Sequence, residues 1–188
     1  PSRDTVKRQL RDKLKQMQAN GDSLDVITFS GNGEPTLHPS FKDIVHDVTV
    51  LRDRYYPQAK VSVLSNATMA ANPRVKQALL AVDNNILKLD SAVARTMRLI
   101  NRPASANVLP AGIIEDLAEY GGKCIVQTMI LRGEHNGERI DNTTTAEIDA
   151  LIDAYKRIRP QEVMIYSIDR KTPEEHLEKV PREELEDI

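Results

Sequence analysis

The chain has 188 residues, of which 40% are hydrophobic and 29% charged, and its formal net charge is −2. This size and composition favour one globular domain over residues 1–188 and exclude a disordered or collagen-like chain. The sequence contains neither an apolar run long enough for a membrane span nor a signal-peptide pattern at its polar start, so we expect a soluble cytoplasmic protein with no membrane partner.

Five short apolar segments, rich in Val, Ile and Leu, predict β-strands. Because they are continuously apolar rather than alternating, we expect helices to cover both faces of each strand. They cover residues 25–30, 60–66, 85–91, 123–131 and 162–168.

Amphipathic segments between these strands predict helices. Their expected ends carry matching signals: Gly21 and Gly121 as helix stops, Pro110 in a first turn, and Thr144 with Glu147 at capping-box spacing. The spacing of the strands is that of βα units, so the sequence predicts an α/β fold with a parallel sheet, either open or barrel-like. The expected helices cover residues 4–20 and lie within 41–51, 75–82, 113–120 and 148–155, with a terminal helix in 171–188.

The order of the elements starts with a helix. In a βα series a strand precedes each helix, and the chain begins with Pro1 instead of Met. We therefore expect a first strand and its loop to be missing upstream of Pro1.

The loop after the first expected strand is the densest in polar and small residues. In parallel βα folds, the loops that follow the strands carry the chemistry. Here residues 29–39 include Gly31, Gly33 and Glu34. Glycines allow the backbone to approach a ligand closely, and Glu34 adds an anionic acceptor, so the loop suits an ammonium group. It lacks GxGxxG and the GK[ST] ending of a phosphate loop, so phosphate-mediated nucleotide binding is not indicated.

With this loop the sequence resembles the radical S-adenosylmethionine (SAM) family, in which a Gly-Gly-Glu motif after the second strand of a partial βα barrel grips the methionine amino group. The form Ser-Gly-Asn-Gly-Glu-Pro-Thr-Leu-His-Pro is similar to that of wyosine-base-synthesis-type enzymes, and residues 65–68, 87–91 and 100–103 continue the match. The resemblance implies a partial parallel (βα) barrel with about five βα units visible and the first strand missing.

The resemblance also implies the activity. Enzymes of this family use a [4Fe–4S] cluster to cleave SAM reductively, and the resulting 5′-deoxyadenosyl radical abstracts hydrogen from a substrate. SAM and the cluster would be the cofactors, with an electron donor such as flavodoxin or ferredoxin, and a tRNA base as the substrate that the branch suggests. The family's CxxxCxxC motif is absent, and Cys124 is the only cysteine. We therefore expect the cluster cysteines upstream of Pro1 and no activity from this chain alone.

The resemblance assigns Asn32, Gly33 and Glu34 to the methionine amino group. Asn32 stands where the family has its first Gly, which is tolerable because Asn accepts left-handed conformations. Ser65 and Asn66 either orient cofactor or substrate or form a structural turn.

Four further candidates for the cofactor site lie at later strand ends. The resemblance places Asp90 and Ser91 near the ribose or carboxylate and Ile168 at the border of adenine. Thr128 is a weaker candidate, because residues 126–134 do not match the family's GxIxGxxE pattern.

Lys88 and Asp90 are two residues apart in one expected strand, so they face the same side. A buried lysine beside a carboxylate is either a Schiff-base nucleophile or, as we favour, half of a buried ion pair. The first interpretation gives an alternative function, a Schiff-base lyase or aldolase on a βα barrel, with Lys88 and Asp90 as catalytic candidates.

A non-catalytic RNA-binding module is the third hypothesis. Basic residues follow three of the expected strands and suit phosphates, although few aromatic residues are available to stack on bases. The histidines show no HxxxH or HExxH spacing, so a zinc site is not indicated, and Cys124 is expected to be a small buried hydrophobe. The basic residues in question are Arg95, Arg98, Arg102, Arg132, Arg139, Arg170 and Lys171.

Overall fold

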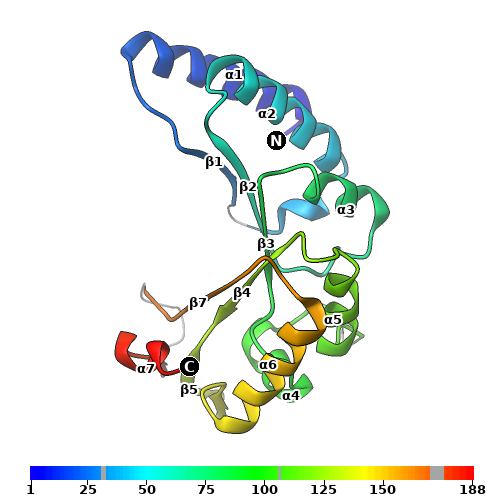
Figure 1. Ribbon diagram of the computed structural model, residues 1–188, viewed down its shortest axis with the longest axis vertical. Helices are drawn as coiled ribbons and strands as arrows, with labels where there is room; N and C mark the ends of the chain where they lie inside the picture. The colour runs from blue at the N-terminus through cyan, green and yellow to red at the C-terminus, as the bar shows by residue number, and fades with distance from the viewer. Residues whose placement is uncertain (31–32, 106, 170–175) are drawn as a thin grey trace. The chain divides into compact units, whose positions relative to one another are not determined.

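The computed structural model describes residues 1–30, 33–105, 107–169 and 176–188 (Figure 1). Its main sheet is parallel, with strand order β1-β2-β3-β4-β7, and all five expected strands are present in slightly shorter form. The predicted α/β fold with a parallel sheet is therefore confirmed. The strands are β1 (Val26–Phe29), β2 (Lys60–Ser65), β3 (Asn84–Lys88), β4 (Ile125–Met129) and β7 (Glu162–Tyr166).

Helices follow the expected pattern, with one addition. Gly21 ends α1 in a left-handed conformation (φ 75°), Pro110 opens α5, and the Thr144 side chain accepts a hydrogen bond from the Glu147 N–H at the start of α6. The sequence did not predict α4. The helices are α1 (Arg3–Asn20), α2 (Phe41–Tyr55), α3 (Pro73–Leu79), α4 (Ala94–Asn101), α5 (Pro110–Ala118), α6 (Thr145–Ile158) and α7 (Arg182–Glu186), with a short 3₁₀ turn, η1 (Pro35–Leu37).

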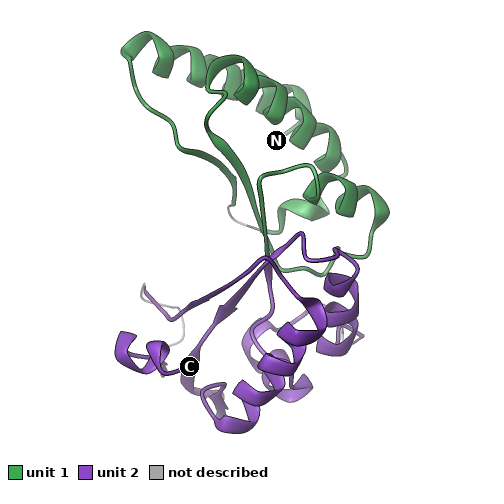
Figure 2. Ribbon diagram, viewed as in Figure 1, with its two compact units in different colours: residues 1–86 green, residues 87–188 purple. Residues whose placement is uncertain are grey.

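The chain divides into two compact units, residues 1–86 (unit 1) and 87–188 (unit 2) (Figure 2). In unit 1, α1 and α2 pack together and cover β1 and β2. Leu14 of α1 meets Leu51 and Tyr55 of α2, while Ile44 and Val48 of α2 pack on Val61 of β2. These contacts give unit 1 a core of its own between the helix pair and the strands.

An ion-pair cluster joins α1 to α2 beside this core. Asp47, whose side chain is 6% exposed, accepts hydrogen bonds from Arg3 Nε at 2.6 Å and Lys7 Nζ at 3.0 Å. The hydrogen bond from Arg3, reinforced by Lys7, outweighs burial and lowers the pKa of Asp47 to about 2.

This lowered pKa predicts acid sensitivity in unit 1. A carboxylate with a depressed pKa stabilises the fold above its unfolded pKa, and that stability is lost as the pH falls. We expect Asp47→Asn to lose roughly 2 kcal/mol at pH 7 and to show little further loss between about pH 4 and 2, where the wild type weakens. Urea unfolding across this pH range measures the free energy of unfolding of both proteins. Asp12→Asn, which replaces an exposed carboxylate, is the control. A wild type and an Asp47→Asn variant with parallel pH profiles would contradict the prediction.

The outer strands are less covered than the sequence predicted. In β7 the residues Val163, Met164 and Ile165 are 36–37% exposed, and in β1 Val26 is 43% exposed. Only β2 and parts of β3 and β4 are buried as expected. The expectation of burial on both faces is thus wrong for β1 and β7, because they are the outer strands of an open sheet, and apolar content alone does not distinguish an outer strand from a central one.

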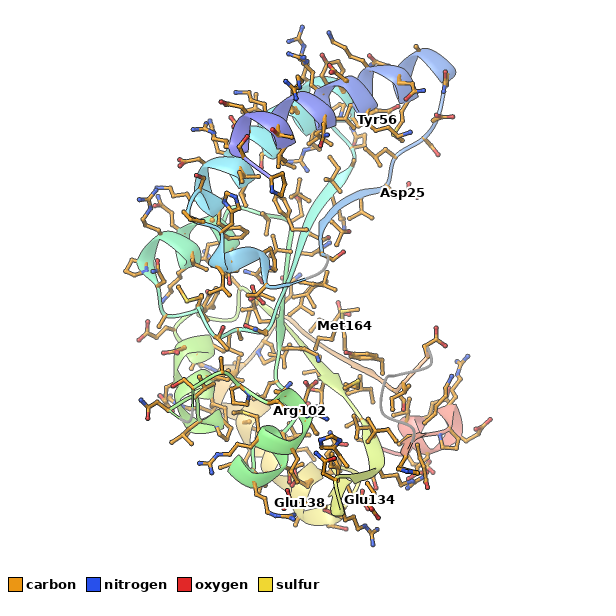
Figure 3. The ribbon with its side chains drawn as sticks, turned by 180° about the vertical axis from the view of Figure 1, so that it is seen from behind. Asp25, Tyr56, Arg102, Glu134, Glu138 and Met164 are labelled. Atoms are coloured by element: carbon orange, nitrogen blue, oxygen red, sulfur yellow. The ribbon has the colours of Figure 1, made fainter. Side chains whose placement is uncertain are left out.

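Unit 2 contains a second sheet that the sequence analysis did not predict. It is antiparallel with the order β6-β5-β8, made of β5 (Leu131–His135), β6 (Glu138–Asp141) and β8 (Leu177–Lys179). Glu134 and Glu138 lie on the two arms of the β5–β6 hairpin (Figure 3). Its turn is Asn136-Gly137, both with positive φ. That dipeptide is the strongest short hairpin signal, but the segments on either side of it are polar and do not have the apolar alternation of typical strands.

None of the helices in the described residues is both long enough and apolar enough to cross a membrane.

Candidate functional site

The Glu34 carboxylate organises the loop after β1 in unit 1. Its Oε1 accepts hydrogen bonds from Thr36 N–H (3.0 Å), Thr36 Oγ1 (2.6 Å) and Ser65 Oγ (2.8 Å), and its Oε2 accepts one from the Asn66 N–H (2.7 Å). Three residues that the sequence singled out, Glu34, Ser65 and Asn66, therefore lie together where β1 and β2 end. We call this group the Glu34 cluster.

Local conformation places these side chains. Gly33 has φ 129°, in the region that favours glycine, which accounts for a glycine at this point of the loop. After β2, the Asn66 side chain accepts hydrogen bonds from both the N–H and the hydroxyl of Thr68, and Ala67 is held at φ 64°. The tight turn directs the Asn66 N–H toward Glu34. Asn32 lies outside the described residues.

A cavity of about 460 Å³ in unit 1 is bordered by this loop. Gly33 and Glu34 supply polar groups, while Phe29, Phe41 and Ile44 supply apolar walls. A largely apolar cavity of this size with a few polar groups is typical of a small-molecule site.

In unit 2, Lys88 and Asp90 form the favoured ion pair. Lys88 Nζ lies 3.0 Å from Asp90 Oδ2, and their side chains are 30% and 0% exposed. Burial by itself lowers the pKa of Lys88, but the charge of Asp90, together with Tyr166, outweighs burial and leaves that pKa raised above its usual value. The Tyr166 hydroxyl, whose own pKa is raised by burial, is a further neighbour of the ammonium that sequence reasoning missed.

Asp90 is anchored by three other groups. Asn101 Nδ2 donates to its Oδ2 at 2.5 Å, and the Met129 N–H donates to its Oδ1 at 2.8 Å. The fully buried Asn142 donates to the carbonyls of Asp90 and Met129, both at 2.8 Å, and accepts from the Leu131 N–H. Asn101 lies in a segment that carried the family resemblance, whereas no sequence signal marked Asn142.

Ser91 belongs to a different network from Asp90. Its side chain is fully buried and donates to Glu147 Oε2 at 2.6 Å, while Thr96 donates to Glu147 Oε1 at 2.5 Å. Glu147 thus ties α4 and the end of β3 to α6. The expected capping box is half formed, because the Glu147 carboxylate bonds to these hydroxyls instead of returning to the N–H of Thr144.

The remaining candidates are placed as follows. Thr128 is fully buried, donates to the Leu89 carbonyl at 2.8 Å and lies 2.6 Å from the Tyr155 hydroxyl. Ile168 is half-buried beyond the end of β7. Cys124 is buried, as expected, and burial raises the pKa of its thiol to about 11.

The basic residues are only partly where the sequence placed them. Arg132 and Arg139 lie on β5 and β6, not in loops, because these residues form the hairpin; Arg170 and Lys171 lie outside the described residues. Arg132 donates to both carboxylate oxygens of Glu184, at 2.7 and 2.5 Å, and Arg139 pairs with Asp141 at 2.8 Å.

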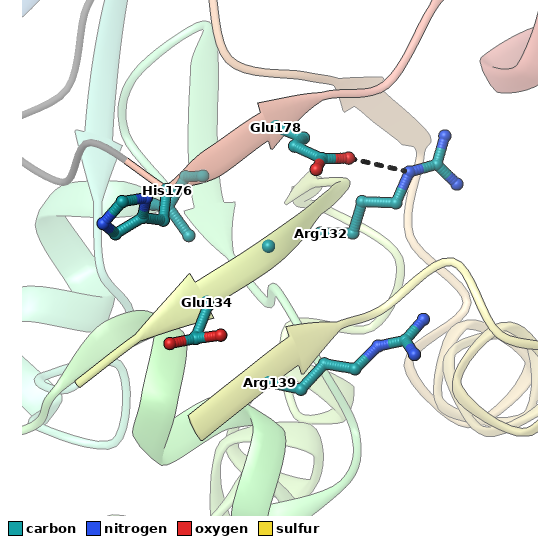
Figure 4. A pocket seen from close by; sticks show the side chains of 7 residues that line it. Arg132, Glu134, Arg139, His176 and Glu178 are labelled. Carbon is teal, nitrogen blue, oxygen red and sulfur yellow. Dashed lines mark ion pairs between the residues drawn. The ribbon is translucent and has the colours of Figure 1, made fainter. Parts of the chain in front are cut away.

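A second cavity, of about 620 Å³, opens on the three-stranded sheet of unit 2 (Figure 4). It is lined by both arginines and also by Glu134, Glu178 and His176. Arg132 faces Glu178 across it at 3.9 Å. Its charges are mixed, and its described lining includes none of the predicted cofactor residues.

Solved structures share this fold. At TM-score 0.69 and 14% identity, the chain matches the structure of TYW1 with a lysine-pyruvate adduct bound, covering 100% of this chain and 61% of that one. At TM-score 0.63 and 16% identity it matches Streptococcus suis SuiB bound to S-adenosylmethionine, over 96% and 39% of the two chains. Both are radical SAM enzymes. The chain has the radical SAM fold. The expected partial barrel is therefore confirmed.

The sequence relatives are longer than this chain. The chain is 31% identical to a UPF0026 protein of Synechocystis over 80% of its residues and 52% of that protein, and 25% identical to a GTPase Obg of Brachyspira hyodysenteriae over 93% of its residues and 24% of that protein. It thus spans between about a quarter and about a half of these relatives' length. No protein-family model matches the chain.

Proposed function

We propose that this chain is the core of a radical SAM enzyme and that it binds SAM at the Glu34 cluster. The observation that carries the proposal is the cavity of unit 1, which has Gly33 and Glu34 on its border in a fold shared with radical SAM enzymes. The SuiB structure holds SAM, which supports the same cofactor here.

The chemistry of the Glu34 cluster fits an ammonium ligand. A carboxylate has about four acceptor positions, two on each oxygen. Among the described residues, Oε1 accepts three hydrogen bonds, two from Thr36 and one from Ser65, whereas Oε2 accepts one, from the Asn66 N–H, so Oε2 is the oxygen that can take a further donor. Apart from Gly33 itself and its chain neighbours, no atom of the described residues lies within 4 Å of the position that a Cβ on Gly33 would take, so this side of the backbone can be approached by a ligand. Glu34 would hold the methionine amino group of SAM through Oε2. Ser65 and Asn66, which donate to the Glu34 carboxylate, would fix the orientation of that carboxylate.

The described residues include no ligands for the iron–sulfur cluster. No three His, Cys, Asp or Glu side chains in that part of the chain lie close enough to share a metal ion, and Cys124 is the only cysteine of the sequence. A reduced [4Fe–4S] cluster, held by residues outside this chain, would supply the electron for the reductive cleavage of SAM, which releases methionine and starts hydrogen abstraction from the substrate. A flavodoxin or ferredoxin as electron donor and a tRNA base as substrate remain proposals from the family branch.

In unit 2, we assign Asp90 and Ser91 supporting roles. Both side chains are buried and hydrogen-bonded within their own networks, so Lys88, which is 30% exposed, is the charged group of this set that a ligand can reach. Its raised pKa keeps the amine protonated near neutral pH. A Schiff-base nucleophile must be a free amine, so this ion pair argues against the lyase alternative.

SAM binding by the 188-residue chain tests the proposal. We expect isothermal titration to give an at least tenfold weaker affinity for Glu34→Gln than for the wild type, because the variant loses the charge that pairs with the ammonium. The amide retains an acceptor for Thr36 and Ser65, and circular dichroism checks that the variant is folded. Glu183→Gln, an exposed carboxylate on α7, is the matched control.

Two outcomes would overturn the proposal: a wild-type chain that does not bind SAM, or a Glu34→Gln variant that binds as tightly as the wild type. Activity is measured separately. The longest encoded polypeptide that contains this chain, reconstituted with iron and sulfide without oxygen, should form 5′-deoxyadenosine, and Glu34→Gln should form less of it.

A further inference from the structure

Helix α1 concentrates positive charge in a protein whose net charge is −2. Side chains that end in nitrogen project from it into solvent (Figure 3). Basic residues outnumber acidic ones along its length; they are Arg3, Lys7, Arg8, Arg11, Lys13 and Lys15, against Asp4 and Asp12.

Part of this charge has a structural role, and part does not. Arg3 and Lys7 both pair with the buried Asp47 of α2. Among the described residues, Arg11 forms an ion pair with its neighbour Asp12 alone, at 3.0 Å and between two exposed side chains. Within the described part of the chain, Arg8 and Lys15 form no ion pair, and both are exposed.

Arg8, Arg11 and Lys15 lie three and four residues apart, so they form one stripe on the helix surface, which we call the α1 stripe. At 1.5 Å per residue it extends about 10 Å along the axis. Opposite charges along the helix account for it only in part. Asp4 and Asp12 stand four residues from Arg8, and Asp12 stands three from Lys15, but in the described part of the chain neither carboxylate forms an ion pair with these two cations. Like charges at the spacings within the stripe destabilise a helix, and cations in its N-terminal half oppose the macrodipole.

The chemistry of the α1 stripe fits phosphate groups. Guanidinium groups bind phosphate through two parallel hydrogen bonds, and a nucleic-acid strand presents about three phosphates over 10 Å. A protein interface needs a buried apolar centre. The apolar residues of α1, including Leu10 and Leu14, instead pack against α2 and the strands.

We propose that the α1 stripe binds the phosphodiester backbone of a nucleic acid. No aromatic residue lies on α1, so binding would be independent of base sequence. The inference goes beyond SAM binding and does not depend on it, because it rests on a different surface of unit 1.

Fluorescence anisotropy with the 188-residue chain tests the inference. The probes are a labelled RNA hairpin, a DNA duplex of the same length and a labelled polyglutamate peptide. The variant is Arg8→Ala/Arg11→Ala/Lys15→Ala, which keeps good helix formers in exposed positions. The control, Lys156→Ala/Lys179→Ala/Arg182→Ala, removes the same charge from exposed sites of unit 2.

We expect the α1 variant to bind nucleic acid about tenfold or more weakly at low salt, with the slope of log K against log salt reduced by roughly 2 to 3. The control variant should keep most of the affinity and most of the salt dependence. Comparison of the RNA and DNA arms identifies which backbone is preferred. Three outcomes overturn the inference. The first two are a wild type that binds neither nucleic acid, and equal losses of affinity for nucleic acid in the α1 variant and the control. The third is binding of polyglutamate as tightly as nucleic acid, which would instead indicate an acidic protein partner.

Discussion

Asp90→Ala should destabilise the protein by about 3 to 5 kcal/mol, because it leaves the half-buried Lys88 ammonium without its counter-charge. The substitution also removes the acceptor of the Asn101 amide and of the Met129 N–H. Chemical denaturation monitored by circular dichroism measures the free energy of unfolding.

Two further variants make this prediction specific. Asp169→Ala removes a carboxylate that is 87% exposed and lies 3.6 Å from Lys179, so its effect should be within about 0.5 kcal/mol. Adding Lys88→Met to Asp90→Ala removes the unpaired charge and should restore part of the lost stability. If the double variant is no more stable than Asp90→Ala, the loss does not arise from the uncompensated charge.

Gly133→Ala should cost about 3 kcal/mol and separate β8 from β5. Gly133 has φ 140°, and a Cβ there would collide with the His176 carbonyl oxygen and stand 2.8 Å from the Leu177 Cα. Both are backbone atoms that cannot rotate away, so overpacking adds to the strain of the positive φ. Hydrogen exchange should show lost protection of the Glu134 N–H, which donates to the His176 carbonyl at 3.0 Å.

Gly137→Ala is the matched control, since Gly137 has φ 78° and a Cβ there would meet no atom of the other described residues within 4 Å, its two chain neighbours aside. It should cost only about 1 kcal/mol, the strain of a left-handed residue. Equal losses from the two substitutions would mean that the close approach of β5 and β8 carries no energetic weight.

The parallel sheet was predictable because each of its strands is a short apolar segment followed by a polar loop. The antiparallel sheet was not, because β5 and β6 are polar and β8 is only three residues long. The hairpin turn at Asn136-Gly137 was visible in the sequence, but the pairing of β8 with β5 joins segments more than 40 residues apart, which no local pattern encodes.

The candidate site divides in the same way. Gly33 and Glu34 were predictable from a dense loop after a strand, and the Lys88–Asp90 pair from two polar residues on one side of a strand. Asn142 was not, because an asparagine before a helix is an ordinary turn residue until the fold brings it to the carbonyls of Asp90 and Met129.

By itself, the sequence determined the order of the elements and which loops are polar, because hydrophobic periodicity and turn residues act over a few positions. Tertiary structure alone decided how each polar group is used. Glu34 accepts from the turn after β2, Asp90 accepts from α4 and β4, and Ser91 donates to Glu147 of α6, because hydrogen-bond partners come from strands and helices distant in the chain. It also decided that Arg3 and Lys7 are used within the fold while Arg8 and Lys15 are left to solvent, since only the packing of α1 on α2 brings Asp47 within reach.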